Sequence, residues 1–542
     1  MHNRAIVLAA GLFASGLLLA SCGGGSERSC SGEVADTETD PLNCGRCGNV
    51  CAENHSCVGG RCLAGECQPG SVEDCYTGAE GTIGIGPCVG GTRTCEATGT
   101  WTKCQGEVIP VGENGPNCTD GVDNNCNGTV DENVDSDMDG YSTCNGDCCD
   151  STECTKPGAV NPGAFDAPGN MVDDDCNGML DDTLLLCDQN IASNTQNALD
   201  YARAIDICQT ATDTDKKWGV ISAALTLTDG TGVPDPESHA VRPRFGAGLF
   251  PRGGVNMVLI SSGGAAAKTD TNPGYHEWQG VFESYKHVGT QTCDFETNTQ
   301  CSPFPQDWFM ANQMNLPNAP GCPDPDGTQA LDPVMLTLRI RVPTNAHSFR
   351  LSTNFYSSEF PEYVCTAYND FFVVLLDSTY SGMPANPSDK NLAFYQPMGM
   401  NMKYPVGVNL GYGNTGLFTQ CTNGTTGCAI VGTPMGNIST CASTSQLTGT
   451  GFDDPDSGMC DAGSLKGGAT GWLVTSGNVT PGEVITLRVA VWDTSDHTWD
   501  SLAVIDGFQW SVDTAMPGTV IFKEKPDLGP VPADAQVSRG NL

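Results

Sequence analysis

Twenty-nine cysteines in a chain of 542 residues constrain this sequence more than any other feature. So many thiols indicate an oxidising compartment and a disulfide framework rather than a reducing cytosol. Cys22 stands apart at the end of an apolar amino-terminal run. The other twenty-eight divide into eighteen between Cys30 and Cys176 and ten between Cys187 and Cys460. Both numbers are even, so each region could close its own bridges.

The net charge of the chain limits the kinds of partner that it can bind. Its 64 acidic residues exceed its 25 basic residues, which gives a formal net charge of -39. Such a chain would repel phosphate groups and no basic patch stands out, so the sequence predicts no nucleic-acid partner. The same acidic balance favours solubility and the binding of cations.

The amino terminus carries a targeting signal. Arg4 precedes an uncharged apolar run over residues 5–20, and Ala20 and Ser21 lead into Cys22. This pattern resembles a bacterial lipoprotein signal, which implies removal of residues 1–21, a lipid anchor on Cys22 and a flexible linker over 22–29. In such lipoproteins, glycine rather than aspartate after the lipidated cysteine implies the outer membrane of a Gram-negative cell, and we expect the protein at the cell surface. The alternatives are an ordinary secretory signal or an uncleaved membrane helix, although the run is short for a span of about 20 residues.

Two cysteine-rich modules are predicted next, over residues 30–67 and 68–117. Small and polar residues dominate them, so neither buries enough apolar surface for a core and disulfides must hold both. Alternation at Thr92 and Thr94, with Trp101 beyond, predicts a hairpin in the second module. A zinc site at Cys44-x-x-Cys47 lacks a second matching pair. Both modules resemble cysteine-rich repeats of secreted myxobacterial proteins, and they predict a loop-dominated stalk.

The Asp-rich segment, residues 118–184, carries the most specific chemistry. Within 118–182 it has sixteen acidic residues and one lysine. The pattern D-x-[DN]-x-[DN]-G occurs three times, starting at Asp123, Asp135 and Asp173. Positions one, three and five can present side-chain oxygens to one cation, glycine at six allows the sharp turn, and a backbone carbonyl at seven and an acid at nine can add ligands. The predicted metal ligands are Asp123, Asn125, Asn127, Asp131, Asp135, Asp137, Asp139, Tyr141, Asp147, Asp150, Asp173, Asp175, Asn177 and Asp181.

These loops depart from an EF-hand. Its bidentate glutamate at position twelve is replaced by Val134, Gly146 and Leu184, and amphipathic helices are lacking. We therefore predict disulfide-braced calcium loops similar to thrombospondin type 3 repeats, with Asp147 and Asp150 completing the middle site. Oxygen donors and the lack of histidine between 118 and 182 favour calcium over copper. The alternative is that the acids only solvate a spacer or cap turns.

The same segment resembles the MopE-related metal-binding repeat. The resemblance rests on residues 120–132, on Gly-Asp-Cys-Cys-Asp at 146–150, on Asn-Pro-Gly at 161–163 and on a second Asp-Asp-Cys-Asn-Gly at 174–178. The family name implies copper. These residues offer only Met138, Met171 and Met179 as soft donors, so the sequence predicts calcium as the bound ion and argues against copper.

Residues 185–525 have the texture of a large β domain. Ser193 or Asn194 could cap a helix through about Ile207, and Cys187 and Cys208 bracket that helix and could pair. Period-two runs near 336–342, 349–355 and 485–491 predict half-buried strands, and the apolar run 371–376 predicts a central strand. The predicted fold is mainly β: an antiparallel β-sandwich of the jelly-roll kind, preceded by the disulfide-rich stalk.

This domain also resembles the choice-of-anchor L family. The resemblance covers roughly residues 185–515 and rests on Trp218-Gly-Val-Ile, on Pro251-Arg-Gly-Gly and on the stretch from Tyr356 to Cys365 with the following Tyr368-Asn-Asp-Phe-Phe. It implies a bacterial surface domain that occurs with various anchors and has no established biochemical role. Here the anchor would be the amino-terminal lipid, and residues 526–542 would form a polar tail.

Catalysis is not predicted. The seven histidines show no helical metal-ligand spacing, and a G-x-S-x-G elbow is absent. Two groups of polar residues could serve a glycosidase, hold loops or bind a structural calcium ion; they are Glu359, Glu362, Asn369 and Asp370, and Asp493, Asp496, Asp500 and Asp506. Our first hypothesis is a calcium-binding surface lipoprotein for recognition or adhesion, with a polysaccharide or cell-surface partner. The alternatives are a glycan-directed extracytoplasmic hydrolase and a metal-scavenging surface protein.

Overall fold

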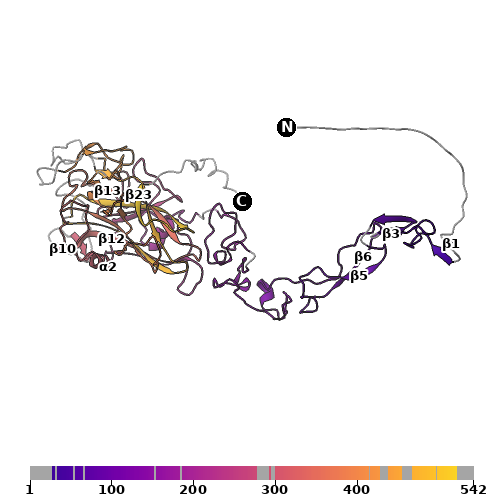
Figure 1. Ribbon diagram of the computed structural model, residues 1–542. Coiled ribbons are helices and arrows are strands. Elements are labelled where there is room, and N and C mark those ends of the chain that lie inside the picture. The colour runs from indigo at the N-terminus through magenta and orange to yellow at the C-terminus, as the bar shows by residue number, and fades with distance from the viewer. Residues whose placement is uncertain are drawn as a thin grey trace, which may run out of the picture. The chain divides into compact units, whose positions relative to one another are not determined.

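The computed structural model describes residues 27–30, 33–52, 55–64, 67–151, 154–182, 186–276, 292–294, 299–413, 415–427, 438–453, 467–495 and 497–521. The signal, Cys22 and the 526–542 tail lie outside these residues. The chain divides into two compact units. Unit 1 runs to Val134 and includes Thr143–Asn145, and unit 2 comprises Asp135–Ser142 and the chain from Gly146 onward. The fold is mainly β, which confirms the prediction (Figure 1).

Unit 1 consists of short hairpins and loops. The hairpins pair β1 (Glu27–Cys30) with β2 (Glu33–Asp36), β3 (His55–Val58) with β4 (Arg61–Ala64), and β5 (Val72–Cys75) with β6 (Gly91–Thr94). Short 3-10 turns follow at η1 (Gly115–Cys118) and η2 (Thr143–Asn145). The Arg93 guanidinium lies 4.9 Å from the centre of the Trp101 ring, and this cation–π contact lies within the predicted hairpin module.

Disulfides take the place of a core in unit 1. In the described part of unit 1, the buried hydrophobic side chains are all cysteines: Cys44, Cys57, Cys67, Cys88, Cys95 and Cys126. The bridges with both partners described are Cys44–Cys57, Cys51–Cys62, Cys67–Cys95, Cys75–Cys104, Cys88–Cys126 and Cys118–Cys144. The prediction that staples hold this coreless region is confirmed.

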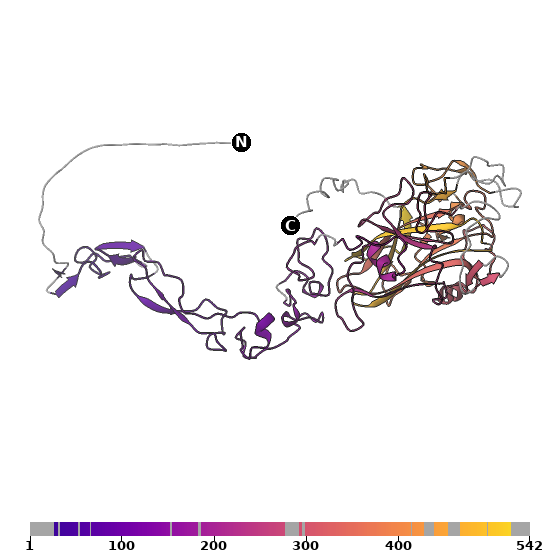
Figure 2. The same ribbon diagram turned by 180° about the vertical axis from the view of Figure 1, so that it is seen from behind.

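Unit 2 contains two antiparallel sheets that pack face to face (Figures 1 and 2). In the first sheet the order is β10 (Thr292–Asp294), β11 (Thr299–Ser302), β12 (Ala330–Arg341), β21 (Val484–Asp493) and β14 (Phe371–Asp377), and β7 (Gly219–Thr226) also pairs with β12. In the second it is β23 (Gly518–Ile521), β20 (Leu473–Asn478), β13 (Ser348–Ser357), β22 (Ser501–Ser511), β9 (Met257–Ser261) and β8 (His239–Arg242), and β19 (Gly468–Ala469) also pairs with β13.

Shorter elements complete unit 2. They are η3 (Pro157–Ala159), α1 (Ala198–Ala204), α2 (Gln306–Ala311), η4 (Val408–Gly411) and the two-residue pairs β15 (Phe394–Tyr395) with β16 (Tyr404–Pro405) and β17 (Gly424–Thr425) with β18 (Ile438–Ser439). Helix α1 starts later than predicted, because the Asn197 side chain, not Ser193 or Asn194, accepts the capping hydrogen bond, from Leu199 N. The predicted Cys187–Cys208 bridge is confirmed.

The predicted period-two strands form the core between the sheets. Leu336, Leu338 and Ile340 of β12 lie opposite Val489, Leu487 and Ile485 of β21, and all six are buried. Strand β14 was expected at the centre of a sheet and instead ends the first sheet. Its two faces are nevertheless buried in two different apolar clusters, and Phe372 N and Leu376 N donate to Val406 O and Lys390 O of a covering loop. That loop covers the outer edge of β14, which explains why residues 371–376 form a continuous apolar run.

Three carboxylates pack around the Arg252-Gly253-Gly254 turn. Asp506 accepts hydrogen bonds from Arg252 N and, at 3.2 Å, from Gly253 N, and Asp188 Oδ2 accepts from the amides of residues 255 and 256 at 2.6 Å each. A Cβ atom on Gly253 would lie 1.8 Å from Asp206 Oδ2, so no larger residue fits there. This motif of the β domain is therefore explained by packing of the backbone against acids.

Asp206 predicts a pH dependence of stability. Burial, and then the charge of Asp188, raises its pKa from 3.8 to about 7. Between about pH 4 and pH 7, the Asp206 carboxyl group therefore keeps its proton in the folded protein but has lost it in the unfolded chain. The stability of the fold should fall as pH rises through that window. Asp206→Asn should flatten this profile and raise stability at about pH 8 by roughly 1–3 kcal/mol, measured by thermal and denaturant unfolding. Asp200→Asn, in a partly exposed ion pair with Arg203, is the control; parallel profiles for wild type and Asp206→Asn would contradict the prediction.

Candidate metal centre

The middle loop of the Asp-rich segment shows how these turns are built. Asp135 Oδ1 accepts a hydrogen bond from Asp139 N at 3.2 Å and Asp135 Oδ2 accepts from Gly140 N at 2.9 Å. Asp139 Oδ1 accepts from Tyr141 N at 2.8 Å. Gly140 has a φ of 95°, a left-handed conformation that favours glycine at position six. The turn is thus fixed by its own acids.

The first and third loops repeat this geometry. Asp123 accepts hydrogen bonds from Asn127 N and Gly128 N at 3.1 and 2.8 Å. Asp173 accepts from Asn177 N and Gly178 N at 3.0 and 2.8 Å. The three copies read from the sequence therefore fold into one recurring turn, in which the acid at position one accepts from the amides at positions five and six.

Carboxylates converge at the middle loop. Oxygen atoms of Asp135, Asp137 and Asp139 lie within 4.8 Å of one another, and so do oxygen atoms of Asp137, Asp147 and Asp150. Asp137 belongs to both groups, so the two groups of carboxylates adjoin each other. The structure thus brings together the middle-loop side chains that the sequence selected, including the two downstream acids.

Burial makes this cluster electrostatically costly. Asp147 is 4% exposed and its Oδ2 atom has no hydrogen-bond partner, and Asp137 Oδ2 has none either. Burial, followed by the charges of Asp139, Asp137 and Asp150, raises the pKa of Asp147 to about 6. Burial and neighbouring acids also raise the pKa of Asp137 and of Asp139. Buried carboxylate oxygens without donors are expensive unless a cation neutralises them.

The middle loop is docked on the β-sandwich of unit 2. Asn161 Nδ2 donates to Asp139 Oδ2 at 2.7 Å, and Asn161 Oδ1 accepts from Thr344 Oγ1 at 2.7 Å. The Lys216 ammonium lies 5.4 Å from the centre of the Tyr141 ring. The Tyr141 side chain is buried, while only its backbone carbonyl was predicted as a ligand. These contacts join the middle site to the sandwich, which the sequence did not predict.

Two acids at position ten were missed by the sequence analysis. Glu132 Oε1 accepts hydrogen bonds from the side-chain amides of Asn125, at 2.5 Å, and Asn127. Asp182 Oδ2 accepts from Asn177 Nδ2 at 2.5 Å. The signal was present, because an acid follows position nine in both outer copies. Glu132 and Asp182 therefore hold the side-chain amide nitrogens of these asparagines. That orientation would leave the asparagine oxygens to face a cation.

The acids at position nine have a different place. Asp131 accepts hydrogen bonds from Gly121 N, the shorter at 3.0 Å. Asp181 accepts from the amides of Gly169, Asn170 and Met171, the shortest at 2.7 Å. Both carboxylates thus brace the turn that precedes their loop.

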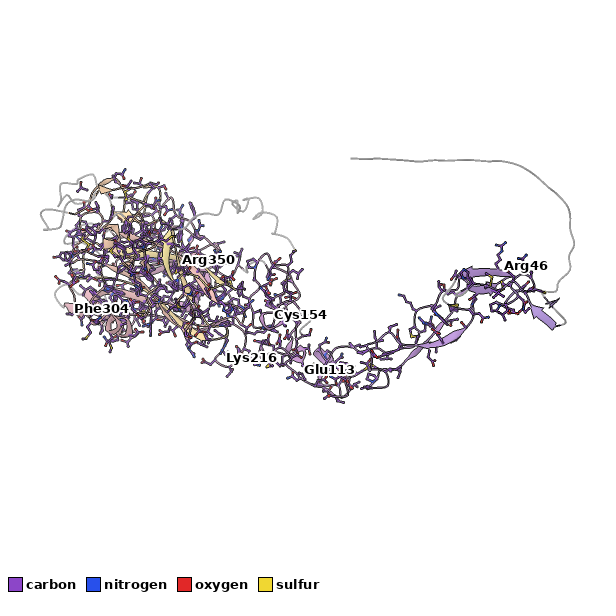
Figure 3. All side chains as sticks on the ribbon, viewed as in Figure 1. Arg46, Glu113, Cys154, Lys216, Phe304 and Arg350 are labelled. Carbon is purple, nitrogen blue, oxygen red and sulfur yellow. A yellow bond between two sulfur atoms is a disulfide. The ribbon has the colours of Figure 1, made fainter. Side chains whose placement is uncertain are left out.

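Soft donors are distributed unevenly. Met138, Met171 and Met179 are 88%, 79% and 60% exposed. Cys149 and Cys154, the latter labelled in Figure 3, are free thiols, which corrects the expectation that all eighteen amino-terminal cysteines pair among themselves. Cys149 is buried beside Asp147, whose Oδ1 accepts from Cys149 N at 2.8 Å. Burial and then Cys154 raise the pKa of Cys149 to about 12, so the thiol is neutral.

Comparison with known proteins identifies two of the three loops. Residues 116–132 and 156–182 match the family model Cu-binding MopE, which carries the description "Putative metal-binding motif". The matched residues hold the first and third loops, and the middle loop lies between them. The chain therefore contains a metal-binding motif, which with the many disulfides indicates an extracellular or surface protein. The comparisons with curated proteins and with solved structures found no match.

No helix among the described residues is long and apolar enough to cross a bilayer. The predicted lipid anchor at Cys22 lies outside the described residues. Of the polar residues singled out in the β domain, those that the structure describes are buried, namely Glu359, Glu362, Asn369, Asp370, Asp493, Asp500 and Asp506. Asp496 lies outside the described residues.

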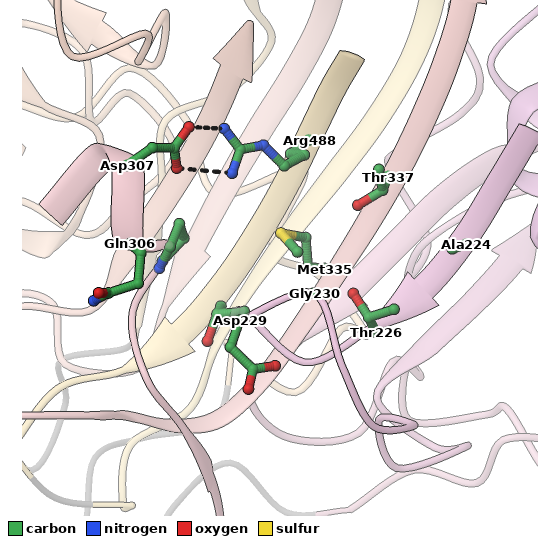
Figure 4. A pocket seen from close by; sticks show the side chains of 11 residues that line it. Ala224, Thr226, Asp229, Gly230, Gln306, Asp307, Met335, Thr337 and Arg488 are labelled. Carbon is green, nitrogen blue, oxygen red and sulfur yellow. Dashed lines mark hydrogen bonds and ion pairs between the residues drawn. The ribbon is translucent and has the colours of Figure 1, made fainter. Parts of the chain in front are cut away.

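A cavity of about 380 Å³ opens beside β7, β12 and β21 (Figure 4). Arg488 donates to both oxygens of Asp307, at 2.9 and 2.6 Å, and Lys390 Nζ donates to Asp307 Oδ2 at 2.7 Å. Burial alone would raise the pKa of Asp307, but these two cations hold it well below its usual range. Asp229 accepts from Thr231 N at 2.8 Å. The cavity is thus lined by Asp307, an ionised acid whose two oxygens both accept hydrogen bonds from cationic side chains.

Proposed function

We propose that this protein is a lipid-anchored surface lipoprotein of the outer membrane that binds calcium through its Asp-rich segment and uses its β-sandwich for recognition or adhesion. The observation that carries the calcium assignment is the convergence of Asp135, Asp137, Asp139, Asp147 and Asp150. Calcium takes six to eight oxygen ligands and tolerates irregular geometry. A cluster of carboxylates with unsatisfied buried oxygens suits that ion.

The donor set favours calcium over copper. The converging atoms are hard carboxylate oxygens, no histidine lies in the segment, and its methionines are exposed. Magnesium would require near-octahedral geometry and retained water, which a crowded set of five carboxylates suits less well. The family name points to copper, but the middle loop lies outside the matched residues.

Limited proteolysis of the full chain tests the assignment. We expect calcium, at roughly 10⁻⁶ to 10⁻³ M, to protect residues 135–182 from cleavage, and a chelator to remove the protection. Magnesium and copper at the same concentrations are the comparison ions. Protection by copper and not by calcium would overturn the assignment.

The lipid anchor predicts a simple change of compartment. Cys22→Ser removes the proposed acceptor for the lipid, so the protein should move from the outer-membrane fraction to the soluble fraction, and incorporation of labelled fatty acid should fall to background. Protease added to whole cells tests surface exposure. A Cys22→Ser protein that remains in the membrane fraction would contradict lipid anchoring.

Metal scavenging is the second candidate function, and one observation favours it. Cys149 and Cys154 are free and interact beside Asp147 and Asp137. Two thiols are soft ligands suited to Cu(I). Loss of Cu(I) binding in Cys149→Ser with calcium binding unchanged would support a separate copper site. Without Cu(I) binding by the wild-type protein this candidate fails.

Recognition by the sandwich is proposed as non-catalytic. Glycoside hydrolysis needs two carboxyl groups that are free to act as proton donor and as nucleophile or base, and both oxygens of Asp307 in the cavity are engaged by Arg488 and Lys390. Thr337 of β12 lines the same cavity and is half-buried. If polysaccharide binds there, Thr337→Tyr should reduce retention of the full chain on polysaccharide arrays. Release of sugar by the wild-type protein would favour the hydrolase alternative.

A further inference from the structure

A second set of acids lies at one end of the sandwich, away from the Asp-rich segment. Asp493 ends β21, and the neighbouring strands of the same sheet place Asp332 near the start of β12 and Asp370 directly before β14. The register pairs Leu331 with Asp493 and Phe371 with Trp492, so Asp332 and Asp370 flank Asp493 on its two sides.

The opposite sheet contributes a fourth acid. Asp500 directly precedes β22. Asp370 links the two sheets, because its Oδ1 accepts from Thr494 N at 3.2 Å and its Oδ2 accepts from Ser501 Oγ at 2.7 Å. Ser501 N in turn donates to Ser262 Oγ at 2.9 Å, which ties β22 to the end of β9. Asp493 thus has Asp332 and Asp370 beside it on its own sheet, and the charge of Asp500 from the opposite sheet also acts on it.

All four acids are removed from solvent. Asp332 and Asp500 are 0% exposed, and Asp370 and Asp493 are 1% exposed. Neither oxygen of Asp493 has a hydrogen-bond partner. Burial, followed by the charges of Asp370, Asp500 and Asp332, raises the pKa of Asp493 well above its usual value, and the nearby Ser262 hydroxyl opposes this only weakly. An isolated buried carboxylate with no donor is unstable unless it is protonated or bound to a cation.

We propose that Asp332, Asp370, Asp493 and Asp500 form a buried calcium site that ties the two sheets of the sandwich together. Asp493 sets this site apart from the Asp-rich loops, because neither of its buried oxygens has a hydrogen-bond partner and three other acids lie near it. Calcium accepts several carboxylates together with hydroxyl or carbonyl oxygens. Complete burial separates the acids from any large substrate, so the site suits a small ion rather than glycan hydrolysis.

Calcium binding by the full chain tests this site. In wild type we expect calcium to slow amide hydrogen exchange in β21 and β22 and to raise the melting temperature of the sandwich by roughly 5–10 °C. Asp493→Asn should abolish both effects. In the presence of a chelator its melting temperature should equal or exceed that of wild type, because the substitution removes a buried charge. Asp332→Asn is a second variant that keeps the test valid if Asp493→Asn folds poorly.

Two controls separate this site from other acids. Asp506→Asn changes another buried acid, one that holds the amides of Arg252, Gly253 and Gly507. It should lower stability and keep the calcium response. Asp147→Asn should weaken the Asp-rich site and leave the response of β21 and β22 intact. The inference is overturned if those strands do not respond to calcium in wild type, or if Asp147→Asn removes the response and Asp493→Asn does not. The second result would leave the proposed calcium loops standing.

Discussion

Reduction of the disulfides under native conditions should unfold unit 1 and leave the sandwich of unit 2 folded. The described part of unit 1 has no buried apolar residue other than cysteine, so little remains to hold it once its bridges open. Each bridge contributes roughly 2–4 kcal/mol, and at least six act here. The sandwich has a continuous core that spans both of its sheets.

Hydrogen exchange with and without reductant measures this difference. Peptides from β5 and β6 should lose essentially all protection, while β12 and β21 should keep theirs. The double substitution Cys75→Ser/Cys104→Ser removes one bridge and should loosen the β5–β6 hairpin without reductant. Cys187→Ser/Cys208→Ser is the matched pair in unit 2 and should leave β12 and β21 protected. Retained protection of β5 and β6 after full reduction would contradict the account.

Asp137→Asn should weaken calcium binding at the middle loop by roughly 100-fold or more. Asp137 belongs to both groups of converging carboxylates, so its substitution removes one charged ligand from each. A change of 100-fold corresponds to about 2.7 kcal/mol. Calorimetric titration of the full chain measures the loss.

Asp181→Asn is the matched control for this substitution. It makes the same charge change in the same segment, but the Asp181 carboxylate accepts hydrogen bonds from the backbone amides of Gly169, Asn170 and Met171. It should leave the affinity of the middle site unchanged. Equal losses in Asp137→Asn and Asp181→Asn would indicate a general effect of charge rather than a site at Asp137.

Local patterns predicted local structure well. Alternation in residues 336–342 and 485–491 predicted strands, and the hexapeptide pattern predicted three equivalent turns, because each depends on residues close in sequence. The Cys187–Cys208 bridge was predictable for the same reason, since the two cysteines flank one short helix.

Long-range arrangements were not predictable from one sequence. The place of β14 at the end of its sheet depends on strands more than a hundred residues away, and its burial depends on a covering loop. The contact of Asn161 with Thr344 spans 183 residues. The approach of Asp332, Asp370, Asp493 and Asp500 likewise follows from strand register. Free Cys149 and Cys154 were missed because an even count does not determine pairing.

Calorimetric titration of the full metal-free chain with calcium and, separately, with copper tests directly whether the Asp-rich segment is a calcium site. We expect saturable calcium binding that Asp137→Asn weakens, together with calcium-dependent ordering of residues 135–150 in hydrogen exchange. Stoichiometric copper binding with no calcium binding would contradict the calcium assignment.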